Sequence, residues 1–324
     1  KAGTAMTSLP AAPLLHGAAQ SAALIYLFSG GKIVLCPSKH FDPHQTWRLV
    51  QDEKVNTMAI VGDAMARPLA EALAAPSASY DTSSLFVIGS GGATYSEGVK
   101  AQLKEKLPTV IMLDSFGGSE GGNQGQSVDR PPDAPGPRFR ADETTAVLDE
   151  DMRPLPPGTG VVGMLARKGR IPLGYYKDAE KTARTFVDVE GERWVVAGDM
   201  AMIEEDGTIT LLGRGSNCIN SGGEKIFPEE VEAALKSHPA VFDAIVVGVP
   251  DERWGERVTA VVQARPGETL TLEELDAHAR TKVSGYKVPR GLHVVEQIVR
   301  QPSGKADYRW AKSIAAGAKA GAEA

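Results

Sequence analysis

The segment Leu113–Gly122 concentrates residue types that can handle a nucleotide. It reads LDSFGGSEGG and places one aromatic ring, four glycines, two hydroxyls and two carboxylates within ten positions. An aromatic ring can stack on a base, glycine N–H groups can reach phosphate, and a carboxylate oxygen can bind Mg²⁺. Spacing alone allows a solvated glycine-rich turn equally well, so the rest of the chain must decide.

The elements expected to position this segment alternate between strand and helix. Short apolar runs predict strands over 32–36, 58–61, 85–89 and 109–113, and helical patterns lie between them over 43–53, 64–75 and 95–107. Such alternation predicts an α/β fold with a mostly parallel, buried sheet. Ligands of such sheets bind at the carboxyl ends of strands, where residues 89–94 and 115–122 fall.

The second half of the chain has a different texture. Proline-rich turns and short extended pieces predict a β-rich subdomain over about 129–212, with Asp206-Gly207 as a hairpin turn. A compact α+β unit follows, and the residues 313–324 read as an Ala/Gly-rich tail. Within the α+β unit we expect helices at 228–237 and 271–283, and strands at 243–249, 258–264 and 292–296.

Composition excludes several classes of protein. The chain has 324 residues and a net charge of −6, which does not favour nucleic acid as a partner. Two cysteines indicate a reducing compartment, hence the cytoplasm. The longest apolar stretch, Leu14–Phe28, is too short and too interrupted to span a bilayer, and no signal peptide opens the chain. Because the sequence begins at Lys1 in mid-pattern, we expect it to be part of a longer protein.

Six further motifs support the hypothesis that the chain binds a nucleotide, and with the segment at 113–122 they occur in a fixed order along the sequence. Besides the segment at 113–122 they are PLLH at 13–16, GSGGA at 89–93, VVAGD at 195–199, GR at 213–214, GGEKIFPEEVE at 222–232 and PSGK at 302–305. Together they resemble the adenylate-forming superfamily of acyl-CoA synthetases, luciferases and peptide-synthetase adenylation domains. The stretches GRGSNCINSGGEKIFPEEVE and PSGKADYRWAK are most similar to bacterial fatty-acyl and steroid side-chain CoA ligases.

The resemblance implies a domain organisation. Residues 1–214 would be the C-terminal part of the large AMP-binding domain, consisting of a βαβ sheet and the β-rich subdomain. Residues 215–312 would form the small, mobile C-terminal domain.

The resemblance also implies roles for residues of the large domain. Phe116 would stack on adenine from a polar turn, Asp114 would accept from the adenine amino group, and Glu120 would bind Mg²⁺. The phosphates would contact Ser119, and Asp199 and Arg214 would hold the ribose, Arg214 also reaching phosphate. The remaining nucleotide contacts would come from the backbone near Gly91, Gly92, Ala93, Ser115, Gly117 and Gly118.

Catalysis is assigned by the same resemblance. Lys305 would bridge the α-phosphate and the substrate carboxylate, offsetting charge that grows as the two anions meet. His16 would lie beside the acyl pocket, although a buried histidine serving only the core explains it too. Gly222 and Gly223 would line the pantetheine tunnel in the second half-reaction.

Two departures from the family pattern matter. The Ser/Thr/Gly-rich phosphate loop that ends in Pro-Lys-Gly is absent, and it would precede Pro13. The hinge position three residues after Arg214 holds Asn217 instead of Asp or Lys. The first departure puts unaided ATP binding by this chain in doubt.

These observations predict an AMP-forming acid–thiol ligase that uses ATP, Mg²⁺ and CoA. Its substrate would be a fatty or steroid-type carboxylic acid, and the chain alone would be inactive. The alternatives are an acyl-AMP ligase, an enzyme that loads a carrier protein, and a non-catalytic nucleotide-binding fragment. The sequence does not decide the acyl group or whether a homo-oligomer forms.

Overall fold

The computed structural model describes residues 5–38, 40–77, 79–127, 137–140 and 142–317. Its contacts divide the chain into two compact units. Unit 1 comprises Lys1–Ser119 and Arg300–Lys305, and unit 2 comprises Glu120–Val299 and Ala306–Ala324. Within the described ranges, no helix combines the length and the apolar character needed to cross a membrane.

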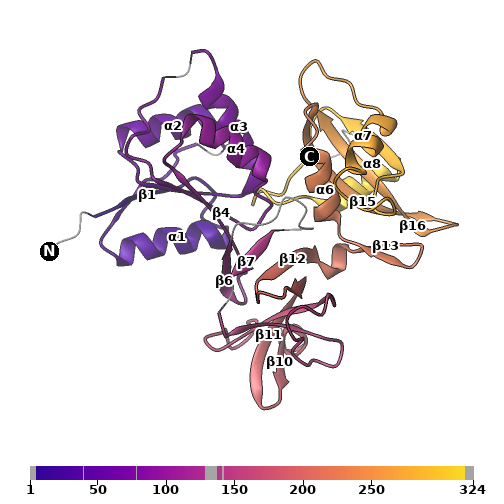
Figure 1. Cartoon of the computed structure of the whole chain (residues 1–324). Coiled ribbons are helices and arrows are strands. Elements are labelled where there is room, and N and C mark those ends of the chain that lie inside the picture. The colour runs from indigo at the N-terminus through magenta and orange to yellow at the C-terminus, as the bar shows by residue number, and fades with distance from the viewer. Residues whose placement is uncertain (1–4, 39, 78, 128–136, 141, 318–324) are drawn as a thin grey trace. The chain divides into compact units, whose positions relative to one another are not determined.

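Unit 1 contains a parallel sheet flanked by helices (Figure 1). Its strand order is β2 (Lys32–Ile33), β1 (Thr7–Pro10), β3 (Thr57–Ile60), β4 (Val87–Gly91) and β5 (Ile111–Gly118). One side of the sheet carries α1 (Gly17–Phe28), and the other carries α2 (Pro43–Asp52), α3 (Gly62–Ala74) and α4 (Glu97–Lys106). Burial of apolar side chains between helices and sheet stabilises the unit, and the indole N–H of buried Trp47 donates to the Leu69 carbonyl at 3.0 Å.

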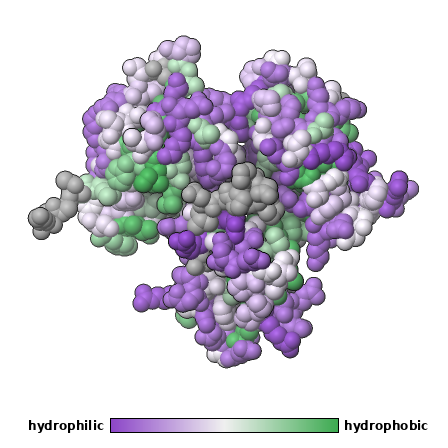
Figure 2. Space-filling view, viewed as in Figure 1, coloured by the Kyte–Doolittle hydropathy of each residue, from purple (hydrophilic) through white to green (hydrophobic). Residues whose placement is uncertain are grey.

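Helix α1 has an unusual distribution of side chains. Its buried residues are the small Ala19 and Ala23, whereas Ile25 and Phe28 are 62% and 86% exposed. Leu24 and Leu27 are exposed as well. Figure 2 shows a hydrophobic surface on the side of unit 1 where Figure 1 places α1. The large apolar side chains of this helix are therefore left exposed in the described structure.

The β-rich part of unit 2 is antiparallel. Its strand order is β6 (Gly122–Ser127), β7 (Arg138–Arg140), β12 (Ile209–Arg214), β11 (Glu192–Ile203), β9 (Gly163–Lys168) and β8 (Thr145–Leu148), with β10 (Phe186–Val189) also paired to β11. The predicted hairpin at Asp206-Gly207 joins β11 to β12, and the Asp206 carboxylate accepts from Thr208 N–H at 3.0 Å. The short helix α5 (Ala179–Thr185) begins at its cap Asp178.

The α+β part of unit 2 has a sheet covered on both faces. The central strand β16 (Gly255–Ala264) pairs with β15 (Val241–Asp251), β13 (Ile219–Ser221) and β17 (Gly291–Val295), and β14 (Glu224–Ile226) pairs with β13. Successive residues of β15 enter different cores: Ala244 and Val246 enter one, Ile245 and Val247 the other. The first core includes side chains of α6 (Pro228–Lys236) and α7 (Leu272–Ala279), and the second those of α8 (Tyr308–Ala315). This alternation explains the continuous apolar run in the sequence.

The α/β fold is confirmed, but several predicted boundaries were wrong. The strands predicted to end at 89 and 113 continue to Gly91 and Gly118. The structure pairs Ser90 with Asp114 and Gly91 with Ser115, so backbone hydrogen bonds extend both strands beyond their apolar residues. The prediction also missed β1, α1 and α5. Most of the predicted tail, residues 318–324, lies outside the described residues, and the boundary at 214/215 stays a prediction.

Candidate functional site

Unit 1 brings together two glycine-containing segments that were predicted to contact nucleotide. Parallel pairing of β4 and β5 places Gly91 beside Ser115, whose hydroxyl donates to the Ser90 carbonyl at 3.2 Å. A Cβ on Gly91 would lie 3.2 Å from the Ser115 carbonyl oxygen. The close approach of the two strands therefore requires a small residue at position 91.

Asp114 occupies a buried position on β5. Lys100 Nζ lies 3.8 Å from its Oδ2. Burial raises the pKa of Asp114 to about 7, and the positive charge of Lys100 offsets only part of this effect. Removal of a carboxylate from water disfavours its charged form. Asp114 therefore titrates near neutral pH, a property that the sequence did not reveal.

The predicted position of Phe116 in a polar turn was wrong. Phe116 lies within β5 and is 8% exposed. Gly117 and Gly118 end the same strand, and the exposed Ser119 follows it. The hydroxyl of Ser119 lies 3.7 Å from the position that a Cβ on Gly17 would take, at the start of α1. The stacking role of Phe116 and the phosphate role of Ser119 stay predictions.

His16, Gly92 and Lys305 meet in unit 1. His16 caps α1 by accepting from Ala18 N–H at Nδ1, and it is 7% exposed. A Cβ on Gly92 would come within 2.7 Å of His16 Nε2 and within 3.5 Å of Lys305 Cε. Gly92 also has a φ of +86°, so only glycine fits this junction without strain.

The Nε2 atom of His16 distinguishes it from an ordinary core histidine. This nitrogen is buried and has no hydrogen-bond partner among the residues that the structure describes. Burial, followed by the positive charge of Lys305, lowers the pKa of His16. A neutral imidazole with an unpaired nitrogen can bind a polar group of a ligand.

Lys305 is placed by a short, hydrogen-bonded turn. Gln301 N–H donates to the Lys305 carbonyl at 2.9 Å, and Gly304 N–H donates to the Gln301 carbonyl at 2.7 Å. The Arg300 guanidinium donates to the Gly304 carbonyl at 3.2 Å. The turn fixes the backbone, while the exposed lysine side chain keeps its conformational freedom.

Unit 2 holds the predicted ribose contacts. Asp199 and Arg214 are registered opposite each other on β11 and β12, and Arg214 Nε lies 3.1 Å from Asp199 Oδ1. Arg214 also donates through Nη1 to the Ala197 carbonyl at 3.1 Å. The two residues that the sequence analysis assigned to the ribose thus form an ion pair in the structure, while their contact with ribose stays a prediction.

Glu120 hydrogen-bonds with a residue that the sequence analysis missed. Tyr175 donates its hydroxyl proton to Glu120 Oε1 at 2.7 Å. Burial acts to raise the pKa of Glu120, but the Tyr175 hydrogen bond and the charges of Arg214 and Lys181 outweigh it, so the pKa is lowered. No local signal in the sequence indicates this contact, because Tyr175 and Glu120 are 55 positions apart.

The donor set around Glu120 suits Mg²⁺ held jointly with phosphates. The described residues contain no group of three or more His, Cys, Asp or Glu side chains that could hold a metal ion. Mg²⁺ binds through one or two carboxylates, substrate phosphates and water, and does not require a protein cage. One carboxylate offers about four lone-pair sites, so the Tyr175 bond leaves capacity for a metal.

Gly222 and Gly223 form the turn of the β13–β14 hairpin, both with positive φ. Gly222 N–H donates to the Trp254 carbonyl at 2.8 Å, and a Cβ on Gly222 would lie 2.9 Å from the Trp254 ring. Arg290 and Arg253 stack on that ring at 3.9 and 4.7 Å. The hairpin is thus braced by an arginine–tryptophan cluster, while its predicted contact with pantetheine stays a prediction.

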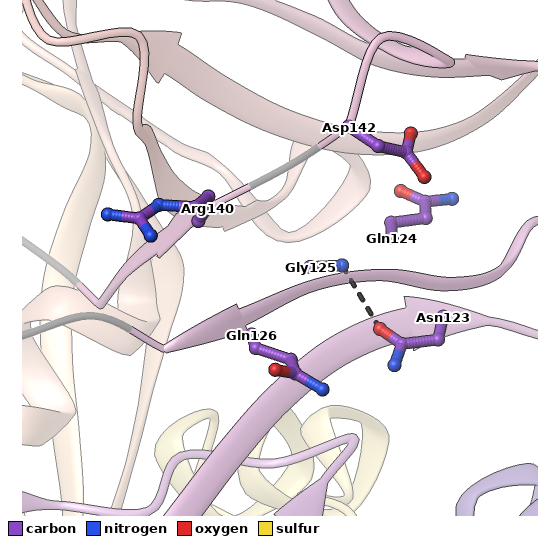
Figure 3. Close-up of a pocket in the computed structure, with 6 residues that line it drawn as sticks. All are labelled: Asn123, Gln124, Gly125, Gln126, Arg140 and Asp142. Carbon is purple, nitrogen blue, oxygen red and sulfur yellow. Dashed lines mark hydrogen bonds between the residues drawn. The ribbon is translucent and has the colours of Figure 1, made fainter.

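A hollow of about 410 Å³ lies on β6 and β7 in unit 2. Figure 3 shows the residues that line it: Asn123, Gln124, Gly125, Gln126, Arg140 and Asp142. Gln124 is 8% exposed, and its Oε1 has no partner among the described residues. Most of these residues carry polar or charged side chains.

The chain belongs to the AMP-binding enzyme family: the AMP-binding enzyme domain matches residues 3–176, and the AMP-binding enzyme C-terminal domain matches 230–305. Its fold is that of adenylate-forming enzymes. Amide bond synthetase McbA from Marinactinospora thermotolerans superposes with a TM-score of 0.79 at 27% identity, covering 96% of this chain and 62% of that one.

Two curated relatives are much more similar in sequence. The medium/long-chain-fatty-acid–CoA/3-oxocholest-4-en-26-oate–CoA ligase of Mycolicibacterium smegmatis is 51% identical over 314 residues, which are 95% of this chain. The 3-oxocholest-4-en-26-oate–CoA ligase of Rhodococcus rhodochrous is 52% identical over 94% of this chain. The chain spans 57% and 55% of the lengths of these two proteins.

Proposed function

We propose that the protein containing this chain is an ATP-dependent acyl-CoA ligase for fatty or steroid-type carboxylic acids. The observation that carries the proposal is 51–52% identity to two CoA ligases over nearly the whole chain. The meeting of His16, Gly92 and Lys305 supports it, as does the Asp199–Arg214 pair.

The reaction has two half-reactions. A substrate carboxylate oxygen attacks the α-phosphorus of ATP, giving acyl-AMP and releasing pyrophosphate. The CoA sulfur then attacks the acyl carbon while the thiol proton passes to solvent, and AMP leaves with the electrons of the broken C–O bond. Lys305 would offset charge in the first step, and Gly222 and Gly223 would let pantetheine approach in the second.

The nucleotide contacts are proposed residue by residue from the family pattern. Asp114 and Phe116 would contact adenine, Asp199 and Arg214 the ribose, and Ser119 the phosphates. Glu120 would bind Mg²⁺, which neutralises phosphate charge when present. His16 would lie beside the acyl group. Acid, ATP and CoA are the proposed small-molecule partners, and the cytoplasm is the proposed location.

Product analysis tests the proposal. The full-length protein is incubated with ATP, Mg²⁺ and a dodecanoic, hexadecanoic or cholestenoic acid, with either CoA or a phosphopantetheinylated carrier protein as acceptor. We expect acyl-CoA and AMP by mass spectrometry. Acyl-AMP that accumulates in the presence of CoA would indicate an acyl-AMP ligase, and thioester on the carrier alone would indicate a loading enzyme. AMP binding without any product would indicate a non-catalytic protein.

A further inference from the structure

Tyr175 is held rigidly within unit 2. Its backbone N–H donates to Thr182 Oγ1 at 2.8 Å, which ties it to α5. Its ring meets Phe186 edge-on at 5.8 Å, and Lys181 Nζ lies 3.9 Å from the ring centroid on its face. With the backbone tied and the ring packed in this way, the hydroxyl has a fixed direction.

The backbone at Gly174, next to Tyr175, packs closely against α5. Gly174 has a φ of +152°, and a Cβ there would lie 2.4 Å from the Thr182 side chain. Thr182 also donates its hydroxyl to the Asp178 carbonyl at 2.7 Å, within the first turn of α5. Loop and helix therefore interlock at the residue before Tyr175.

Glu120 lies outside the strands, in a glycine-rich segment. It falls between the end of β5 and the start of β6 and is followed by Gly121 and Gly122, the latter with a φ of +68°. A glutamate there has three side-chain torsions to order, and ordering them costs conformational entropy. The Tyr175 hydroxyl removes that freedom by binding one carboxylate oxygen.

We propose that Tyr175 is a positioning residue whose hydroxyl holds the Glu120 carboxylate in the orientation that receives the Mg²⁺ of bound ATP. The inference rests on the proposed function of Glu120. Partners that orient a metal-binding carboxylate contribute 10–100-fold to metal affinity in other proteins. The rigid loop thus supplies order that the glycine-rich segment lacks.

The competing explanation is that Tyr175 only packs. Its ring contacts with Phe186 and Lys181 would persist with phenylalanine, so Tyr175→Phe removes the hydroxyl alone. The matched control is Tyr176→Phe, because Tyr176 is adjacent and 89% exposed. Its ring has a contact with Lys177 Nζ at 5.2 Å, which phenylalanine would retain.

The experiment measures Mn²⁺ binding by electron paramagnetic resonance, using the full-length protein with ATP. We expect Tyr175→Phe to weaken Mn²⁺ binding at least 10-fold with an unchanged thermal midpoint, and Tyr176→Phe to have no effect. Saturating Mg²⁺ should restore most of kcat in Tyr175→Phe. In a Glu120→Gln background the Tyr175→Phe effect should vanish, because the two side chains act as one unit.

Several outcomes would overturn the inference. Wild-type Mn²⁺ affinity in Tyr175→Phe would do so, as would a loss that persists in the Glu120→Gln background. If Tyr175→Phe does not fold, Glu120→Asp provides the second variant. Aspartate is one methylene shorter than glutamate, so its carboxylate should not reach the Tyr175 hydroxyl. A Mn²⁺ affinity equal to that of wild type would then contradict the inference. Failure of the proposed function is seen separately, as absence of acyl-CoA from the wild-type protein.

Discussion

Asp199 and Arg214 face each other across β11 and β12, with Nε and Oδ1 3.1 Å apart. Both side chains are partly exposed, and such surface pairs contribute at most about 1 kcal/mol to stability. The pair therefore adds little to the stability of the fold. Under the proposed function, the Asp199 carboxylate would exchange this partner for ribose hydroxyls at small cost.

Replacement of Asp199 by alanine should weaken the binding of both AMP and ATP. A carboxylate that holds two hydroxyls contributes about 2–3 kcal/mol, because hydrogen bonds to charged groups are the stronger class. Isothermal titration of the full-length protein with AMP measures the change. Asp206→Ala is the control, since Asp206 caps a hairpin turn on the same pair of strands. Equal AMP affinity in wild type and Asp199→Ala would show that Asp199 does not contribute to nucleotide binding.

Lys305→Ala should slow the first half-reaction and leave the second unchanged. One electrostatic group that acts on the transition state contributes about 3–4 kcal/mol, so pyrophosphate release should fall by two to three orders of magnitude. Thioester formation from supplied acyl-AMP should continue. Lys312→Ala, which alters the basic residue in the last turn of α8, is the control. Pyrophosphate release at the wild-type rate would remove Lys305 from the mechanism.

Glu229 should make stability depend on pH. Burial, then the charge of Glu232, raises the pKa of Glu229 to about 7, whereas its ordinary value is 4.5. Asp199 adds to this effect, while Glu229 Oε1 accepts from Arg214 N–H at 3.4 Å. The raised pKa means that the unfolded chain binds fewer protons than the folded chain between pH 4.5 and 7, so stability falls across that range and stays lower above it.

The variant Glu229→Gln isolates this effect, because it removes the charge but keeps an acceptor for Arg214. The difference of roughly 2.5 pKa units corresponds to about 3 kcal/mol. We expect Glu229→Gln to have a higher thermal midpoint than wild type at pH 8 and nearly the same midpoint at pH 4.5. The exposed Glu224→Gln should behave as wild type at both values. A pH-independent difference between Glu229→Gln and wild type would refute the assignment.

Gly222→Ala should impair thioester formation more than adenylation. The new methyl would meet the Trp254 ring at 2.9 Å and sit at a φ of +62°, so the hairpin must shift. Gly223→Ala is the companion variant, since it also has positive φ but nothing within 4 Å of its Cβ. Rates of the two half-reactions, measured separately, give the comparison. A larger defect from Gly223→Ala than from Gly222→Ala would show that backbone strain matters more than contact with Trp254.

The chain as given should form no CoA thioester. It should also bind hydrophobic dyes through the exposed apolar side chains of α1. Ile25 and Phe28 present large apolar side chains to solvent on one helix, and such patches favour association. Ile25→Lys with Phe28→Lys should lower dye fluorescence and self-association in sedimentation. Leu173→Lys, at a residue 94% exposed on a loop, is the control. Ligase turnover by the unmodified chain would disprove the first expectation.

The local pattern of apolar and polar residues predicted those helices and strands that have one apolar and one polar face. Helix α2 begins at Asp42-Pro43 as expected, because a side-chain cap and a proline at the first turn are legible in sequence. Helix α1 was missed because its apolar residues surround the helix, which leaves no 3.6-residue period to detect. The ends of β4 and β5 were missed because pairing with a neighbouring strand extended them.

The candidate site shows the same division. Residues such as Asp199 and Lys305 could be proposed from sequence because the ordered motifs around them resemble those of the adenylate-forming superfamily. Tyr175 could not, since its partner Glu120 lies 55 positions earlier and only the folded loop brings them together. The shifted pKa values of Asp114 and Glu229 likewise depend on burial, which has no signature in the local sequence.

Residues 300–305 belong to unit 1 although the chain on both sides of them belongs to unit 2. The backbone consequently crosses between the units at three places, after residues 119, 299 and 305. Within unit 1, a Cβ on Gly304 would lie 3.5 Å from the Val61 side chain, so this six-residue segment packs beside residues far earlier in the sequence. Lys305 ends that segment, and its Cε lies 3.5 Å from the position that a Cβ on Gly92 would take. The meeting of His16, Gly92 and Lys305 in unit 1 can therefore form only after nearly the whole chain has been synthesised.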